Sequence, residues 1–252
     1  MAEAIAQRYG LPDILGRVLA ARGVPMEAVE AFLAPTLRDL MPRPEALNDM
    51  EKGARRIADA VVKGEVIGII GDYDVDGVSS TALAVRILRA VGATVHVHIP
   101  DRILECKESQ DRLAQRGPSR AAVASLHGKG ARLLITLDCG VMAHDPLLHA
   151  RELGMETVIV DHHQAEAELP EAEAVINPNR LDDVSGFGYL CAAGVALILC
   201  AVLLKELRGR GWFADGREAP DLLANVDSAG PHRSIDRDPD GGTERLQPCQ
   251  ER

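Results

Sequence analysis

A chain of 252 residues with 46% apolar and 26% charged side chains has the composition of a globular protein with one large or two small domains. This composition excludes collagen, a disulfide scaffold and a wholly disordered chain. The 28 basic and 38 acidic residues give a net charge of −10, so the chain lacks the basic footprint of a simple nucleic-acid binder. Aromatic residues, at 3%, offer few base-stacking platforms. A metal-dependent enzyme stays allowed, because clustered carboxylates are metal ligands.

The cysteines indicate the cellular setting. They are odd in number, scattered and without a Cys-x-x-Cys pair, which predicts a reduced, cytoplasmic environment. The N-terminus has no positive region followed by an apolar run, so we expect no signal peptide. The longest apolar stretch, 189–204, spans 16 residues and is short for a membrane helix. It predicts a buried helix and no membrane partner.

Residues 1–50 predict a small helical lead-in. Leu11-Pro12 opens one helix, and Val29, Phe32 and Leu33 have helical spacing in the next. Residues 51–225 are expected to form the catalytic domain. Residues 226–252 lack apolar periodicity and predict a disordered tail.

Short apolar, β-branched segments alternate with helical patterns from residue 50 onward. The expected strands are Val66–Gly71, Thr94–Ile99, Arg132–Leu137, Thr157–Val160 and Ala174–Ile176. The helical patterns include Met50–Val62, Ser80–Ala90 and Cys191–Leu207. Continuous apolar strands that alternate with helices predict an α/β fold with a parallel, doubly wound sheet.

Three carboxylates alternate directly after the first expected strand, in Gly71-Asp72-Tyr73-Asp74-Val75-Asp76-Gly77. They stand at the end where a parallel sheet opens its ligand crevice. In an extended segment Asp72, Asp74 and Asp76 would share one side. Such crowding of like charges is costly unless a cation lies among them. The run therefore predicts a cation site.

Two alternative interpretations of this acidic run fail. An EF-hand loop that starts at Asp72 needs a bidentate Glu at its twelfth position, where the chain has Leu83. A Walker P-loop needs Gly-Lys-Ser/Thr, and no Lys lies near the run. A solvated acidic turn stays open for the motif taken alone. Ser79 or Ser80 is expected to cap the helix that follows.

Two later strands also end in side chains that bind metals. Asp138-Cys139-Gly140 follows one, and Asp161-His162-His163 follows the other. Each alone has an ordinary explanation as a helix cap or a polar loop. Because three parallel strands end at one edge, their combination predicts one site. Oxygen ligands with one or two histidines suit Mn²⁺ or Mg²⁺, and two such ions would activate a water and stabilise the leaving oxygen of a phosphoester.

These three motifs, in this order, resemble the DHH phosphoesterase superfamily and, more closely, its bacterial RecJ-type single-strand-specific DNA exonucleases. The resemblance covers about residues 10–225. Four further segments share the pattern: Phe32-Leu33-Ala34-Pro35, Ile99-Pro100-Asp101-Arg102, Asn177-Pro178-Asn179 and Leu190-Cys191-Ala192-Ala193-Gly194-Val195-Ala196. It implies stepwise 5′-to-3′ hydrolysis of phosphodiester bonds in single-stranded DNA, in repair and recombination. A single-strand-binding protein and a helicase are the other implied partners.

The resemblance also implies a role for each site residue. The residues that would ligate two Mn²⁺ or Mg²⁺ ions are Asp74, Asp76, Asp138 and His162. Asp138 would bridge the two ions. His163 would face the scissile phosphate, while Asp72 and Asp161 would orient neighbouring groups.

Substrate contacts are implied for Arg102, Asn177 and Asn179. A surface salt bridge is the alternative for the arginine, and turn formation is the alternative for the two asparagines. The helix Cys191–Leu207 is expected to lie in the core, with its N-terminus directed at a phosphate.

Two segments depart from the family pattern. A polar stretch, 106–116, stands where relatives have a Glu-Gly-Tyr-Gly-type turn, and it resembles an insertion or a frame disturbance. After Leu223 relatives continue into an apolar strand with a further Asp, whereas this chain stays polar. Asp227 is therefore not assigned that role. We expect a truncated or frame-shifted end without the family's later domains.

The favoured interpretation is the N-terminal catalytic part of a RecJ-type nuclease, with activity impaired by truncation. One alternative is a DHH phosphoesterase of short oligonucleotides or cyclic dinucleotides, against which the helical lead-in and the segment 190–196 count. Another is an inactive metal-binding fragment, because one family ligand and half of the substrate cleft are missing.

Overall fold

The computed structural model describes residues 1–36, 43–101, 117–214 and 216–222. Several expectations lie outside the described residues: Arg102, the stretch 106–116, Asp227 and the tail 226–252. The chain divides into two compact units, Met1–Arg43 and Pro44–Arg252, and each is described by itself.

The first unit is the expected set of short helices. Its elements are α1 (Ala2–Tyr9), α2 (Asp13–Ala21), the 3-10 turn η1 (Met26–Ala28) and α3 (Val29–Leu33). Ile5, Leu19 and Val29 form its buried core. Gly16 lets α2 approach α1, because a Cβ there would overlap the carbonyl of Ala2. The sequence pattern predicted the later helices but not α1.

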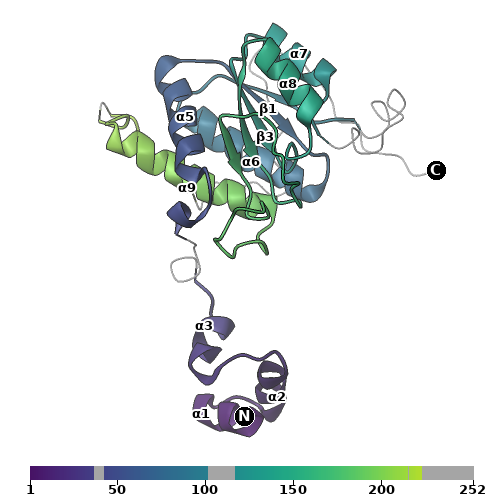
Figure 1. Ribbon diagram of the computed structural model, residues 1–252. Coiled ribbons are helices and arrows are strands. Elements are labelled where there is room, and N and C mark those ends of the chain that lie inside the picture. Colours follow the sequence, from purple (N-terminus) through teal and green to yellow (C-terminus); the bar gives the residue numbers. More distant parts are fainter. Residues whose placement is uncertain (37–42, 102–116, 215, 223–252) are drawn as a thin grey trace, which may run out of the picture. The chain divides into compact units, whose positions relative to one another are not determined.

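The second unit is built on a five-stranded, all-parallel sheet, which confirms the predicted fold class (Figure 1). The strand order is β2-β1-β3-β4-β5. The strands are β1 (Ile67–Gly71), β2 (Val95–His98), β3 (Leu133–Leu137), β4 (Glu156–Val160) and β5 (Ala174–Ile176). All five expected strands are present, with ends that differ from the predicted ones by at most one residue.

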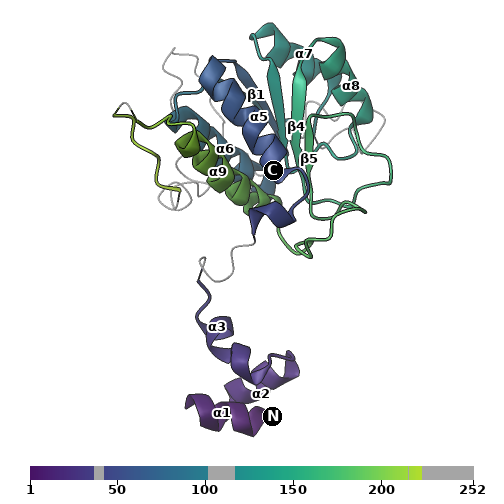
Figure 2. The same ribbon diagram turned by 60° about the vertical axis from the view of Figure 1, so that its left-hand side comes forward.

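Helices cover both faces of the sheet, as Figure 2 shows. On one face lie α5 (Met50–Lys63), α6 (Val75–Ala90) and α9 (Ala192–Gly209). On the other lie α7 (Arg120–Gly128) and α8 (His144–Glu152). A 3-10 turn, η2 (Pro44–Ala46), precedes α5.

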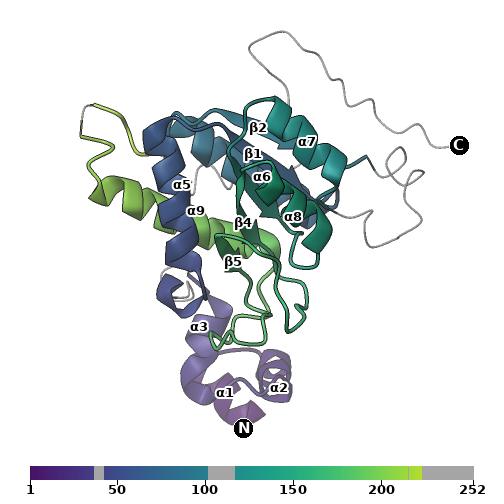
Figure 3. The ribbon, with the colours of Figure 1, turned by 45° about the horizontal axis from the view of Figure 1, so that its top comes forward.

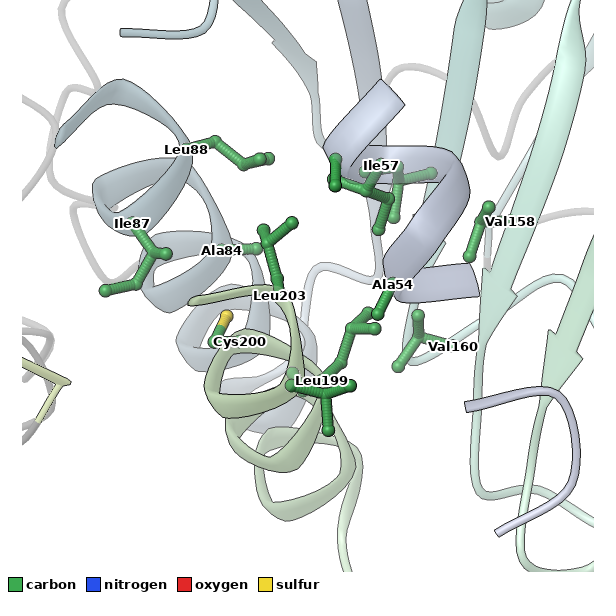
Figure 4. Close-up of a cluster of buried hydrophobic side chains, with 14 of the residues drawn as sticks. Ala54, Ile57, Ala84, Ile87, Leu88, Val158, Val160, Leu199, Cys200 and Leu203 are labelled. Atoms are coloured by element: carbon green, nitrogen blue, oxygen red, sulfur yellow. The ribbon is translucent and has the colours of Figure 1, made fainter. Parts of the chain in front are cut away.

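The strands are apolar along their length because both faces are buried. In β1, Ile69 belongs to the core beneath α5, α6 and α9, while its neighbour Ile70 belongs to the core beneath α7 and α8. Figure 4 shows part of the first of these cores, to which Ile57 of α5, Ile87 of α6 and Leu203 of α9 contribute. Helix α9 is the predicted buried helix. None of the helices in the described ranges has the length and apolar character that crossing a membrane demands.

Helix α6 starts earlier than the sequence predicted, and its cap is a different residue. The helix begins at Val75, and Asp74 is its N-cap: the carboxylate accepts hydrogen bonds from the N–H groups of Asp76 and Gly77. The expected cap at Ser79 or Ser80 is wrong, because Ser80 lies inside the helix and its hydroxyl donates to the carbonyl of Asp76. An Asp at the N-cap accepts hydrogen bonds from backbone N–H groups of the first helical turn, which have no partner inside the helix. The acidic run is consequently a helix start and not an extended segment.

Gly71 allows β1 and α6 to approach closely just before the acidic run. A Cβ on Gly71 would overlap the hydroxyl of Thr81 and lie 3.3 Å from the Thr81 Cβ, and Thr81 is buried and β-branched. Its side chain therefore has little freedom to yield. This contact fixes the distance between the end of β1 and the helix that carries Asp74 and Asp76.

We expect Gly71→Ala to lower the free energy of unfolding by about 1–3 kcal/mol, because the added methyl overpacks this contact. The matched control is Gly128→Ala in α7, where a Cβ has nothing within 4 Å. That variant should change stability by about 1 kcal/mol or less, in the stabilising direction. Urea unfolding measures both. Equal stability of the two variants would show that the approach of β1 to α6 is not tight.

Candidate metal centre

Three aspartates stand in one row at the carboxyl edge of the sheet. Each continues the strand ladder by one residue: Asp72 N–H donates to Leu137 at 3.2 Å, Asp138 N–H to Val160 at 2.9 Å and Asp161 N–H to Ile176 at 3.0 Å. Since the strands are parallel and in register, the three carboxylates come side by side. All three are buried, at 2%, 1% and 1% exposure. The prediction that separate strands bring their acidic ends to one edge is confirmed.

The surroundings of Asp138, in the middle of the row, oppose a negative charge on its carboxyl group. Burial, followed by the negative charges of Asp76 and Asp74, raises the pKa of Asp138 to about 8. Its Oδ1 is buried and accepts no hydrogen bond. Its backbone is left-handed, with φ 61°, which ends the strand and turns the chain at Gly140. A buried carboxylate oxygen without a donor is costly unless a cation meets it.

His162 presents a lone pair to that same oxygen. Its Nδ1 lies 3.2 Å from the carbonyl of Leu190, which can only accept, so the proton of the neutral ring is on Nδ1. The other nitrogen, Nε2, is then unprotonated and lies 3.2 Å from Asp138 Oδ1. When Asp138 is ionised and the ring is neutral, two acceptor atoms therefore face each other. The Leu190 carbonyl is a functional group that the sequence could not reveal, because backbone carbonyls carry no sequence signal.

This arrangement fits a divalent cation. Two ligands of one octahedral ion, each about 2.1 Å from it and at right angles, lie about 3 Å apart. That is close to the separation of Asp138 Oδ1 and His162 Nε2. A histidine whose second nitrogen donates to a carbonyl is the usual orientation of a metal ligand. Asp138 also belongs to two overlapping groups of three whose ligand atoms lie within 4.8 Å of one another: Asp138, His162, His163 and Asp72, Asp74, Asp138.

Asp161 has the opposite environment from Asp138, although both are fully buried. Burial opposes its ionisation, but hydrogen bonds from His163 and from the Val141 N–H outweigh this and lower the pKa of Asp161. One oxygen accepts from the N–H groups of His162 and His163 and from His163 Nδ1 at 2.7 Å, and the other accepts from Val141. Asp161 is a satisfied anion that holds the two histidines.

His163 is a charged, half-exposed imidazole. The hydrogen bond to Asp161 raises its pKa to about 9, so the ring is protonated at neutral pH in the metal-free protein. Because Nδ1 is engaged by Asp161, His163 is poorly suited to bind a metal through that atom. Its Nε2–H is the free end of the ring as a hydrogen-bond donor to an anion.

Asp76 lies at a junction that the sequence did not reveal. Its two carboxylate oxygens accept the N–H groups of Ala192 and Ala193, both at 2.8 Å, at the N-terminus of α9. The expected phosphate at that helix end is therefore replaced by a carboxylate, which suits the same partial positive charge. Asp76 Oδ2 is also 3.5 Å from His162 Nε2. Its assignment as a metal ligand stays a prediction.

The two asparagines after β5 contact the histidine backbone. Asn177 is fully buried, and its amide donates to the carbonyl of His163 at 2.9 Å. The Asn179 amide donates to the carbonyl of His162 and to that of Gly188. Their expected contact with substrate stays a prediction, whereas a role in holding the Asp161-His162-His163 segment is visible.

This fold and this row of carboxylates and imidazoles define a class of protein: an α/β domain with a candidate metal site at the carboxyl edge of a parallel sheet. Residues 66–223 match the DHH family, N-terminal domain, and the chain belongs to this family. The resemblance in the sequence is thereby confirmed.

The curated relatives are RecJ exonucleases. The chain is 35% identical over 217 residues to the single-stranded-DNA-specific exonuclease RecJ of Escherichia coli K12. It is 32% identical over 206 residues to the RecJ of Bacillus subtilis 168. These matches cover 86% and 81% of this chain but only 35% and 25% of the relatives. The chain thus spans between a quarter and about a third of the length of these curated relatives.

Two solved structures of RecJ are also similar to this chain. A crystal structure of exonuclease RecJ bound to manganese matches with TM-score 0.57 and 29% identity, over 73% of this chain and 42% of that one. RecJ from Thermus thermophilus, in complex with Mn²⁺, matches with TM-score 0.56 and 27% identity, over 84% and 29%.

The row of carboxylates predicts how stability depends on pH without metal. The folded-state pKa of Asp138, about 8, lies above its unfolded value near 4. Its ionisation therefore destabilises the fold as pH rises between those values. His163, at about 9 when folded and near 6.5 unfolded, stabilises below pH 6.5 and loses this effect toward pH 9. We expect the melting temperature in chelator to fall from pH 5 to pH 9.

The control separates the two groups. Asp138→Asn removes the fall in melting temperature that the ionisation of Asp138 causes. The melting temperature of this variant should therefore be nearly constant from pH 4.5 to 6.5 and fall only above pH 6.5. Calorimetry in chelator at unit pH intervals measures this. A parallel fall in wild type and variant below pH 6.5 would contradict the assigned pKa of Asp138.

Proposed function

We propose that the chain is the metal-binding part of a nuclease that hydrolyses phosphodiester bonds in single-stranded DNA, from 5′ to 3′. The observation that carries the proposal is the buried Asp138 Oδ1, which has no hydrogen-bond partner and lies 3.2 Å from His162 Nε2. Membership of the DHH family and similarity to RecJ exonucleases, two of them described with manganese, support the metal and the substrate class.

The ligands that we propose for one or two Mn²⁺ or Mg²⁺ ions are Asp74, Asp76, Asp138 and His162. Asp72 belongs to the same carboxylate group and is the alternative to Asp76, which also caps α9. When bound, the cations supply a water nucleophile at neutral pH and Lewis-acid stabilisation of the phosphate charge. Bound cations would also offset the charges of Asp76 and Asp74, which, after burial, raise the pKa of Asp138.

The chain's own residues supply orientation and a proton. Asp161 holds His163 through Nδ1 and keeps the ring protonated. His163 can therefore donate a charge-assisted hydrogen bond from Nε2 to a phosphate oxygen. His162 is fixed through Nδ1 by Leu190, so its lone pair keeps one direction. A half-exposed position lets His163 reach a substrate from solvent.

A cytoplasmic location is proposed from the cysteine pattern. The direction of digestion and the role in DNA repair and recombination are proposed from the family resemblance alone. So are the partners, a single-strand-binding protein and a helicase. The match covers 35% of the Escherichia coli relative, so the activity of a full-length RecJ is itself a proposal for this chain.

The test is digestion of 5′-phosphorylated single-stranded DNA by the purified chain with Mn²⁺. We expect mononucleotides to be released from the 5′ end and release to stop in chelator. Asp138→Asn should lower the rate at least about a hundredfold, since the residue meets the cations directly. Cleavage of dinucleotides alone would favour a phosphoesterase of short substrates. Metal binding without any cleavage would identify an inactive fragment.

Asp145→Asn is the matched control. Asp145 is an exposed aspartate of α8 whose ion pair with Arg120 lies on the surface. Such pairs contribute little, so this variant should retain the wild-type rate. If Asp138→Asn digests DNA as fast as Asp145→Asn does, the proposed metal centre is wrong.

A further inference from the structure

The loop 177–190 lies between β5 and α9, which Figure 3 labels. This loop contacts the two histidines at three points. Asn177 donates to the carbonyl of His163, and Asn179 donates to that of His162. At the far end of the loop, Leu190 accepts from His162 Nδ1. The orientation of the His162 ring therefore depends on where this loop lies.

The loop is cross-linked within itself. The Asn177 side chain accepts the N–H of Asn179 at 2.8 Å, and the Asn179 amide reaches Gly188. A Cβ on Gly188 would lie 2.5 Å from Asn179 Oδ1, so a side chain there would displace the Asn179 amide. A displacement near residue 180 is consequently transmitted to both asparagines.

Arg180 anchors this loop to the start of α5. Its Nη1 lies 2.8 Å from Asp49 Oδ2 and 2.6 Å from the carbonyl of Val175. Its Nε and Nη2 bind the two oxygens of Asp182 at 2.9 and 2.8 Å. The Arg180 side chain is 10% exposed and that of Asp49 is 33% exposed, so the pair is partly shielded from solvent. Only a planar fork makes all these contacts at once, which a lysine cannot do.

Asp49 is itself held in a special conformation. It precedes α5 with φ 59°, one of two non-glycine residues with positive φ among the described residues. Such backbone is costly for a residue with a Cβ and persists where surrounding contacts enforce it. Asp49 Oδ2 also accepts the N–H of Val175 in β5 at 3.1 Å. Next to it, Asn48 binds the side chain of Asp183 and the carbonyl of Asp182.

We propose that the Asp49–Arg180 ion pair is a positioning device for the metal centre. It fixes the loop 177–190 against α5, and the loop in turn fixes His162 and His163. The inference rests on the proposed metal-dependent function for its purpose, but the geometry it predicts for His162 is independent of any activity. Asp49 and Arg180 act through other residues and are positioning residues.

The first test is Mn²⁺ affinity, measured by calorimetry on Arg180→Gln. Loss of an outer contact of a metal ligand typically costs about 10- to 100-fold in affinity, and we expect about tenfold here. Asp49→Asn should act in the same direction, because its amide oxygen can still accept from Val175 but no longer carries the charge that Arg180 meets. The double variant should lose little more than either single one.

Arg56→Gln is the matched control. Arg56 of α5 is 11% exposed and binds two carboxylates, Glu65 and Glu156. Both partners lie at the amino ends of β1 and β4, the edge opposite the metal centre. This variant should lose comparable thermal stability and keep the wild-type Mn²⁺ affinity. Equal loss of affinity in Arg56→Gln and Arg180→Gln would reduce the pair to a purely structural role and overturn the proposal.

The second test reads His162 directly in the metal-free protein. Nitrogen-15 NMR of the imidazoles, assigned with His162→Gln, should show the Nδ1–H tautomer in wild type and in Arg56→Gln. In Arg180→Gln we expect a mixture with the Nε2–H tautomer. An unchanged tautomer in Arg180→Gln would overturn positioning even if the chain binds Mn²⁺ and digests DNA. Absence of Mn²⁺ binding in wild type would overturn the proposed function, and the NMR result would still decide the positioning.

Discussion

The register of the parallel sheet forces three buried carboxylates into one row, and the rest of the site is a response to that constraint. Asp72, Asp138 and Asp161 each continue the ladder of their strand by one residue, so they cannot separate without breaking strand pairing. In low-dielectric surroundings such anions need donors or a cation. The surrounding loops provide donors for some of these oxygens and leave Asp138 Oδ1 without one.

Two equally buried aspartates, Asp161 and Asp138, differ in their hydrogen bonds and in the direction of their pKa shifts, and this difference distinguishes a structural role from a functional one. Asp161 accepts four hydrogen bonds and has a lowered pKa, so it is a stable anion that organises the histidines. Asp138 has an oxygen without a donor and a raised pKa. A fold that needed only stability would satisfy both. The unsatisfied one is the group that a cation would meet, together with His162.

Much of the fold was predictable, because its signals are local. Apolar strands and the acidic or imidazole residues that directly follow them identified the sheet, its parallel arrangement and the edge at which Asp72, Asp138 and Asp161 meet. The start of α6 was predicted wrongly. Asp74 caps the helix with its side chain, whereas the sequence also offers Ser79 and Ser80, whose side chains can cap a helix in the same way.

The contacts that orient the site were not predictable. Asp76 reaches the N–H groups of Ala192 and Ala193, and Asp49 reaches Arg180, across separations of 116, 117 and 131 residues. Such pairs depend on how loops fold over the sheet edge, and charged residues in loops read as ordinary solvated side chains. The Leu190 carbonyl, which lies 3.2 Å from His162 Nδ1, belongs to the backbone and leaves no trace in the sequence.

The most direct test of this account is the anomalous difference density of a crystal of the chain soaked in Mn²⁺ and measured at the manganese edge. The account predicts a peak within about 2.3 Å of both Asp138 Oδ1 and His162 Nε2. Absence of a peak there at saturating Mn²⁺, or a peak only at surface carboxylates, would contradict it.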